Sequence, residues 1–270
     1  MPPVQVRLVV VGGGQMGGAL IAGLVAAGWD AWDVGVVEPA PERKERLAAE
    51  HVGINVLESV SAARVRPEGG AVLAVKPDIA ESVCAGIKSS ETRRVLSVVA
   101  GLSVERLEAA LGADISVVRG MPNAAVRVGA GVSAVSGGGR ASSEDLNWAV
   151  GLLGTVGTVV RVPERLLHVV TALSGSGPAY LCLVAEALIE AGVSGGLSRE
   201  ASRQLVIGTL LGSSKLMIAT GEAPEKLRDS VTSPGGTTSA GLRALEARAV
   251  RSAFLEAVMS AAERSRQLGR

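Results

Sequence analysis

The stretch VRLVVVGGGQMG, residues 6–17, decides the fold of the first half of the chain. A valine-rich run over 6–11 stops at three glycines, and residues 15–27 then carry apolar side chains with a helical period. Strand, glycine turn and helix in this order open a parallel α/β unit. Gly12, Gly14 and Gly17 have the spacing that admits a tight turn, a pyrophosphate and close helix packing. The stretch therefore predicts a dinucleotide at the helix start, with a ligand-free packing turn as the alternative.

Strand and helix patterns continue to alternate as far as residue 163. Further apolar runs predict strands over 34–37, 71–75, 94–99, 115–118 and 131–135. Helical patterns separate the first of them, over 41–50 and 78–87 and after a capping serine at position 103. Because the strands are continuously apolar, we expect a sheet that is covered on both faces. Residues 1–163 are thus predicted to form a Rossmann-like, doubly wound domain.

The remaining residues, 164–270, are predicted to form an all-helical domain. Strand-like runs stop, and helical patterns cover 166–173, 178–191, 199–220, 224–231, 240–247 and 250–268. The segment 179–191 is apolar nearly all round, and its only charges, Glu186 and Glu190, lie on one face. A helix of this kind is usually buried on most sides. Burial against a second copy of the chain is the simplest solution.

The composition narrows the classes of partner and compartment. The 27 basic and 26 acidic residues leave a net charge of +1, and no basic block stands out, which argues against nucleic acid or an anionic membrane as partner. The start of the chain lacks the pattern of a signal peptide, and no uninterrupted apolar run reaches the length of a membrane span. Cys84 and Cys182 lack metal-ligand spacing. We expect a cytoplasmic protein with no metal site.

Glu38 follows the second predicted strand, 21 residues after Gly17. An acidic residue at this place hydrogen-bonds the adenosine ribose and repels a 2′-phosphate, which favours NADH. The alternative is a solvent-exposed carboxylate at a strand end. Arg43 and Lys44 lie close by in the sequence and would instead attract a phosphate, so the cofactor preference stays open.

Small or turn-forming residues end two further strands. They are Ala74, Val75, Lys76 and Pro77 after one strand, and Ala100 and Gly101 after the next. Ligands of such sheets bind outside the carboxyl ends of the strands, so these residues are predicted to contact the cofactor. Lys76 is a candidate catalytic lysine, and the alternative is a structural residue at the strand end.

Two polar loops interrupt the helical half. Residues 174–178, SGSGP, suit a junction between two helices. Residues 232–238, TSPGGTT, bring hydroxyl and backbone N–H donors together just before a helix. Such a nest of donors binds a carboxylate or a phosphate. The alternative for the second loop is a simple capped turn.

Five motifs in order resemble those of the pyrroline-5-carboxylate reductases: VGGGQMG at 11–17, AVKP at 74–77, MPN at 121–123, LSGSGPAY at 173–180 and DSVTSPGGTT at 229–238. The similarity spans about residues 6–268. The last two motifs are specific to that family, whereas the glycine turn is shared with many dehydrogenases. The pair Ala124-Ala125 departs from the more usual Thr-Pro.

The resemblance implies reduction of the cyclic imine 1-pyrroline-5-carboxylate to L-proline by an interleaved homodimer, often assembled into a decamer. It implies that NADPH or NADH contacts Gln15, Met16 and Asn123 as well as the residues above. It also implies that the substrate lies on Ser233, Gly235, Gly236, Thr237 and Thr238. Hydride transfer to a C=N bond needs no nucleophile or metal, so a hydroxyl such as that of Thr238 suffices to orient the nitrogen.

Two other functions remain as alternatives. One is a two-domain hydroxyacid dehydrogenase with Lys76 or Lys215 as its acid, which the serine–glycine–proline and threonine-rich loops argue against. The other is a non-catalytic dinucleotide sensor, which would not need the hydroxyl-rich loop.

Overall fold

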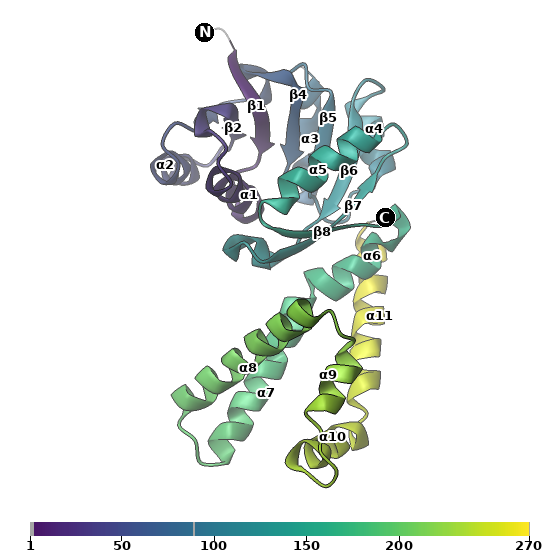
Figure 1. Ribbon diagram of the computed structural model, residues 1–270. Coiled ribbons are helices and arrows are strands. Elements are labelled where there is room, and N and C mark those ends of the chain that lie inside the picture. Colours follow the sequence, from purple (N-terminus) through teal and green to yellow (C-terminus); the bar gives the residue numbers. More distant parts are fainter. Residues whose placement is uncertain (1–2, 89, 270) are drawn as a thin grey trace. The chain divides into compact units, whose positions relative to one another are not determined.

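A computed structural model describes residues 3–88 and 90–269. Its first compact unit, Met1–Ser176 with Ala261–Arg270, is built on an eight-stranded sheet in the order β3-β2-β1-β4-β5-β6-β7-β8 (Figure 1). The strands are β1 Val4–Val11, β2 Val34–Val37, β3 Asn55–Leu57, β4 Ala63–Leu73, β5 Arg94–Ser97, β6 Ser116–Met121, β7 Gly131–Gly137 and β8 Gly157–Arg161. All neighbours are parallel except β6 and β7.

Helices cover both faces of this sheet, as the continuously apolar strands predict. One hydrophobic cluster joins the strands to α3 (Pro77–Lys88) and α4 (Val104–Leu111). The other joins them to α1 (Gln15–Ala26), α2 (Pro41–Glu50) and α5 (Ser143–Gly154). Alternate residues of β1 enter opposite clusters, with Val9 and Val11 on one face and Leu8 and Val10 on the other. The doubly wound, Rossmann-like fold is therefore confirmed.

Several elements of this unit lack the continuous apolar run from which strands are predicted. The part of β4 before Ala71 contains Pro67, Glu68 and two glycines, and β3 is very short, so neither forms an apolar run. Helix α5 begins with a capping box between Ser142 and Asp145, and strand β8 follows it. Strand β8 extends the sheet beyond the last strand expected from the sequence. Strand β7 lies between β6, to which it is antiparallel, and β8, to which it is parallel.

The second compact unit, Gly177–Ser260, is entirely helical. It contains α7 (Gly177–Ser194), α8 (Arg199–Thr220), α9 (Pro224–Ser230), α10 (Thr237–Ala247) and the first part of α11 (Val250–Leu268). The helices expected from the sequence are confirmed here, and α8 has the expected bounds. Within one chain the apolar side chains of α7 stay exposed, for example Leu181 at 59% and Leu183 at 66%. The unit alone does not bury them.

The helical run that leads into α7 bears on the expectation that the chain has no membrane span. The stretch Glu164–Ser194 is a helical run made of η4 (Glu164–Leu166), α6 (Leu167–Val170), η5 (Thr171–Gly175, a π-helix) and, after the bend at Ser176, α7. By length and composition it is long and apolar enough to cross a membrane, although it lacks the uninterrupted apolar stretch on which the sequence prediction depends. Scattered small and polar residues interrupt the apolar side chains of this run. A single helix of this kind is weak evidence for a membrane span, because helices that bury apolar surface in proteins pass the same test.

The chain passes between the two units twice. It leaves the first unit after Ser176 and returns at Ala261, so that the last turns of α11 belong to the sheet-containing unit. There Ser265 Oγ lies 3.1 Å from His168 Nδ1 of α6. A Cβ atom on Gly101 would lie 3.4 Å from the carbonyl oxygen of Leu268. The boundary at 163/164 expected from the sequence follows the change in composition. The compact units instead divide after Ser176 and before Ala261, so both contacts above lie within the sheet-containing unit.

Candidate functional site

The glycine turn between β1 and α1 is a tight backbone crossing. Gly12 has φ +102°, and a Cβ atom there would lie 2.6 Å from the carbonyl oxygen of Ala74. A Cβ atom on Gly17 would collide with the carbonyl oxygen of Gly12. Gly14, in contrast, has no atom within 4 Å of the place where its Cβ would stand. The turn therefore requires glycine at positions 12 and 17 and leaves space open beside position 14.

The start of α1 suits a phosphate. Gly14 is its N-cap and offers no side chain to the first N–H groups, and the first turn contains no acidic residue. Unsatisfied N–H groups and the helix dipole together attract anions at such an end. The open space beside Gly14 and the uncapped helix fit a pyrophosphate, so the residues present fit a dinucleotide.

Glu38, directly after β2, reaches this turn. Its Oε2 accepts a hydrogen bond of 3.0 Å from the Gly13 backbone N–H, and its Oε1 accepts one of 2.9 Å from Ala40 N–H. Arg43 forms an ion pair with the same Oε1 at 3.0 Å. The carboxylate is buried, which excludes the alternative of a solvent-exposed acid at a strand end.

The other strand-end residues lie at the same edge of the sheet. Ala74 follows β4 and donates its N–H to the carbonyl oxygen of Val11 at 2.8 Å, which places it beside the glycine turn. Gly101 follows β5 and has φ +78°. Lys76 is exposed, and Pro77 begins α3. The structure thus gathers the predicted cofactor residues at the carboxyl ends of the parallel strands.

A pocket of about 420 Å³ lies in this unit next to the start of α1. The predicted residues Gln15, Met16 and Asn123 line it. Asn123 is held in place because its side-chain oxygen accepts hydrogen bonds from the N–H groups of Ala125 and Val132, at 3.3 and 3.1 Å. The other residues that line the pocket were not predicted as site residues: Met121, Pro122, Ala124, Val126, Arg127, Thr171, Gly175 and Ser176.

The π-helical turn explains why the loop at 174–178 contributes to this pocket. Residues Thr171–Gly175 form the wide turn, closed by a hydrogen bond of 2.8 Å from Ser176 N–H to the carbonyl oxygen of Thr171. Such turns occur often at functional sites. By itself the SGSGP motif indicates only a helix junction, because a single-turn π-helix has no pattern of its own in the sequence.

The predicted substrate loop lies in the helical unit. Gly235 has φ +71°, and Gly236 is the N-cap of α10, which has no side-chain cap. Thr232 donates its hydroxyl to the carbonyl oxygen of Arg228 at 2.6 Å, so it closes α9. The half-buried Thr238, in the first turn of α10, has no hydroxyl partner among the described residues. The loop therefore offers an uncapped helix start and a free hydroxyl.

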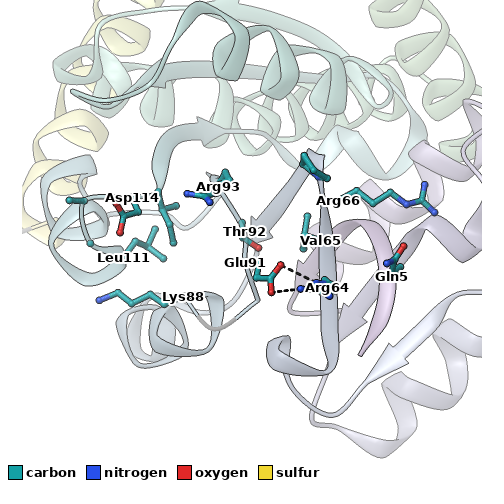
Figure 2. Close-up of a pocket in the computed structure, with 14 residues that line it drawn as sticks. Gln5, Arg64, Val65, Arg66, Lys88, Glu91, Thr92, Arg93, Leu111 and Asp114 are labelled. Atoms are coloured by element: carbon teal, nitrogen blue, oxygen red, sulfur yellow. Dashed lines mark hydrogen bonds and ion pairs between the residues drawn. The ribbon is translucent and has the colours of Figure 1, made fainter. Parts of the chain in front are cut away.

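Another hollow of the sheet-containing unit lies away from the glycine turn. It measures about 810 Å³ and lies at the amino ends of the strands, where Arg64, Lys88 and Arg93 line it (Figure 2). Arg64 is ion-paired with Glu91 at 2.8 Å, and α3 and α4 end there with their C-termini. Helix C-termini favour nearby cations, so these basic residues complement the helix ends and are no evidence for an anion site.

Comparison with known proteins identifies the family. Residues 164–268 match the model described as pyrroline-5-carboxylate reductase dimerisation. Over 97% of its length the chain is 40% identical to the pyrroline-5-carboxylate reductase of Corynebacterium melassecola, of which it covers 98%. The chain belongs to the pyrroline-5-carboxylate reductase family. The reductase of Synechocystis is 38% identical over 98% of the chain and 99% of its own length.

Solved structures of this family agree in fold. The pyrroline-5-carboxylate reductase of Coxiella burnetii superposes with a TM-score of 0.92 at 32% identity, over 98% of this chain and 99% of its own. The Plasmodium falciparum reductase with NADP bound gives 0.83 at 32% identity, over 99% and 100%. Residues 7–101 also match a model described as NADP oxidoreductase, coenzyme F420-dependent. This stretch contains the glycine turn, Glu38 and both predicted strand ends.

Proposed function

We propose that this protein reduces 1-pyrroline-5-carboxylate to L-proline with NADH or NADPH, the last step of proline biosynthesis. The observation that carries the proposal is the match to pyrroline-5-carboxylate reductases over nearly the whole chain, together with an intact dinucleotide turn. The specific substrate loop, residues 229–238, retains its hydroxyl and glycine residues in an uncapped helix start.

The residues of the chain bind and orient the reactants. A bound nicotinamide supplies the hydride. Gly14 and the first turn of α1 hold the pyrophosphate, and Glu38 hydrogen-bonds the adenosine ribose. The strand ends at 74–77 and 100–101 contact the rest of the cofactor. In the helical unit, the donors of Ser233, Gly235, Gly236 and Thr237 hold the substrate carboxylate. Thr238 orients the imine nitrogen with its free hydroxyl.

The rival enzyme class lacks support in the structure. A hydroxyacid dehydrogenase needs an acid to protonate an alkoxide, and the candidates were Lys76 and Lys215. Both lysines are exposed. Lys215 lies within α8, outside the loop that gathers the hydroxyl groups. A catalytic lysine is usually held in a partly desolvated place, which neither position provides within one chain.

The assay that tests the proposal follows oxidation of NADH and of NADPH at 340 nm with pyrroline-5-carboxylate as substrate. We expect turnover with this imine and none with a 2-oxo acid of similar size. Turnover of only the 2-oxo acid would instead indicate a hydroxyacid dehydrogenase. Nucleotide binding without turnover of either substrate would indicate a sensor.

The exposed apolar faces of α7 and α8 predict self-association. Leu205 and Leu211 of α8 are 60% and 56% exposed, in addition to the leucines of α7. Obligate interfaces of this kind bury more than about 2,000 Å². Sedimentation velocity at micromolar concentration should show a dimer or a multiple of it, and we propose the decamer as the larger form. A stable monomer would contradict the proposal, and Leu183→Glu should shift the distribution towards monomer.

A further inference from the structure

The last turn of α11 packs against the loop that follows β5. Ser265 Oγ of this turn lies 3.1 Å from His168 Nδ1 of α6. A Cβ atom on Gly269 would lie 3.0 Å from the carbonyl oxygen of Gly101 and 3.5 Å from His168 Cε1, so the three residues meet at one place. Gly101 is one of the proposed cofactor residues. The end of α11 and the His168 ring therefore contact a loop of the cofactor site.

The short helix α6, which contains His168, leads directly into the lining of the pocket beside α1. Thr171 and Gly175 of the π-helix η5 line that pocket together with Ser176. The hydroxyl of Thr171 donates a hydrogen bond of 2.8 Å to the carbonyl oxygen of Leu167, the neighbour of His168 in α6. A displacement of α6 would therefore move the pocket lining as well as the contact with the loop after β5.

Two guanidinium groups lie near the ring of His168, on different elements. Arg119 of β6 is buried and forms an ion pair of 2.9 Å with Glu164 of η4. Arg266 of α11 is paired with Glu263 on the same helix. The charge of Glu164 is shared, because its Oε1 accepts both the arginine and the first backbone N–H of α4, at 2.7 Å. This acid therefore compensates a further positive charge on the ring only in part.

The neutral ring is the form that fits this place. Burial is the main cause that lowers the pKa of His168, and Arg119 and Arg266 add to it, against opposing effects of Glu164 and Ser265. When the last turn of α11 is released, the ring regains water and an ordinary pKa of about 6.5. Because the pKa is lower in the docked state, protons favour the released state. Docking is thus strongest above about pH 6.5 and weakens as the pH falls below that value.

We propose that His168 is a positioning residue, whose neutral ring holds the last turn of α11 against Gly101 and so fixes this loop for the nicotinamide end of the cofactor. The inference rests on the proposed function and deepens it by adding a regulation of the same site by pH. Protonation of the ring places a third positive charge beside Arg119 and Arg266 and releases the turn. The nicotinamide end is then held less well, whereas the adenosine half, at Glu38, keeps its contacts.

Fluorescence titration of the full-length protein with NADH, and displacement of NADH by ADP-ribose, test the proposal without turnover. ADP-ribose lacks the nicotinamide and so reports the rest of the cofactor site. Between about pH 8 and about pH 5.5 the wild type should lose about two- to tenfold in NADH affinity, comparable to the loss of one neutral hydrogen bond. The affinity for ADP-ribose should stay constant over the same range.

Variants of the two histidines assign the pH dependence. His168→Asn keeps a polar atom in the place of Nδ1 and does not titrate, so it should bind NADH equally well at both ends of the pH range. His168→Gln replaces the asparagine variant if that fails to fold. His51, at the end of α2, is the only other histidine of the chain. His51→Asn is therefore the matched control and should keep the wild-type pH dependence.

Ser265→Ala tests the docking contact itself. It removes the hydroxyl beside the ring and should lower NADH affinity about two- to tenfold at the alkaline end of the range. Ser252→Ala is its control, since Ser252 lies in the same helix but in the helical unit, where it contacts Glu256. That variant should bind NADH as the wild type does.

The proposal is overturned by a constant NADH affinity of the wild type, by the wild-type pH dependence in His168→Asn, or by unchanged NADH affinity in Ser265→Ala. A parallel loss of ADP-ribose affinity also overturns it, because the whole nucleotide-binding unit, and not the loop at Gly101, would then respond to pH. Failure of the proposed function is distinct, because the wild type would then not bind NADH even under alkaline conditions or not reduce pyrroline-5-carboxylate.

Discussion

Gly17→Ala is expected to abolish measurable NADH binding and to destabilise the sheet-containing unit. A Cβ atom at position 17 would overlap the carbonyl oxygen of Gly12, so the turn and α1 would have to separate. Overpacking of this kind costs about 1–3 kcal/mol, and more where the obstacle is backbone. Displacement of the first turn of α1 also removes the phosphate site. NADH titration by fluorescence and thermal unfolding measure the two effects.

Gly18→Ala is the matched control for this variant. The two glycines are neighbours in the same helix, yet a Cβ atom on Gly18 meets its nearest atom at 3.7 Å, an ordinary contact. Alanine also suits a helix interior better than glycine, by about 0.5–1 kcal/mol. We expect Gly18→Ala to bind NADH as the wild type does and to unfold at the same or a slightly higher temperature. Equal behaviour of the two variants would refute a close approach at Gly17.

Thr238→Val is expected to lower kcat/KM for pyrroline-5-carboxylate about ten- to a hundredfold, the range of a lost charge-assisted hydrogen bond of about 1.5–3 kcal/mol. Valine keeps the shape of threonine, so the loss reports the hydroxyl. Because the nitrogen contact strengthens as the imine becomes an amine, kcat should fall and not only KM rise. Steady-state kinetics at saturating NADH separate the two constants.

Thr238→Ser is the rescue variant, because it restores a hydroxyl without the methyl group. It should recover most of the activity that Thr238→Val loses. NADH affinity should be the same in both variants, since the predicted cofactor residues all lie in the sheet-containing unit. Full activity of Thr238→Val would show that the loop is only a helix start. The substrate assignment would then rest on family membership alone.

The parts of the fold that the sequence predicts are those with strong local patterns. The strand–glycine–helix opening and the long helices α8 and α11 are present as expected, because each pattern is repeated over many residues. The first half of β4 and the short β3 are held by pairing with neighbouring strands, which a local pattern does not reveal.

The same distinction applies to the candidate site. Gly12, Gly17 and Glu38 are predictable because each carries a constraint that few residue types meet. The partners of Glu38 are not, since Gly13 lies 25 residues away from it in the sequence. Thr171 and Ser176 enter the pocket through a π-helical turn whose residues look like an ordinary helix end.

The return of the chain after Ala261 makes the helical unit an insertion within the nucleotide-binding unit. The sheet-containing unit is therefore assembled from two stretches of the chain that lie on either side of the helical unit in the sequence, and it is complete only when the second stretch packs against the first. A fragment cut at residue 163 lacks both α6 and the final turns of α11, so it is an incomplete domain.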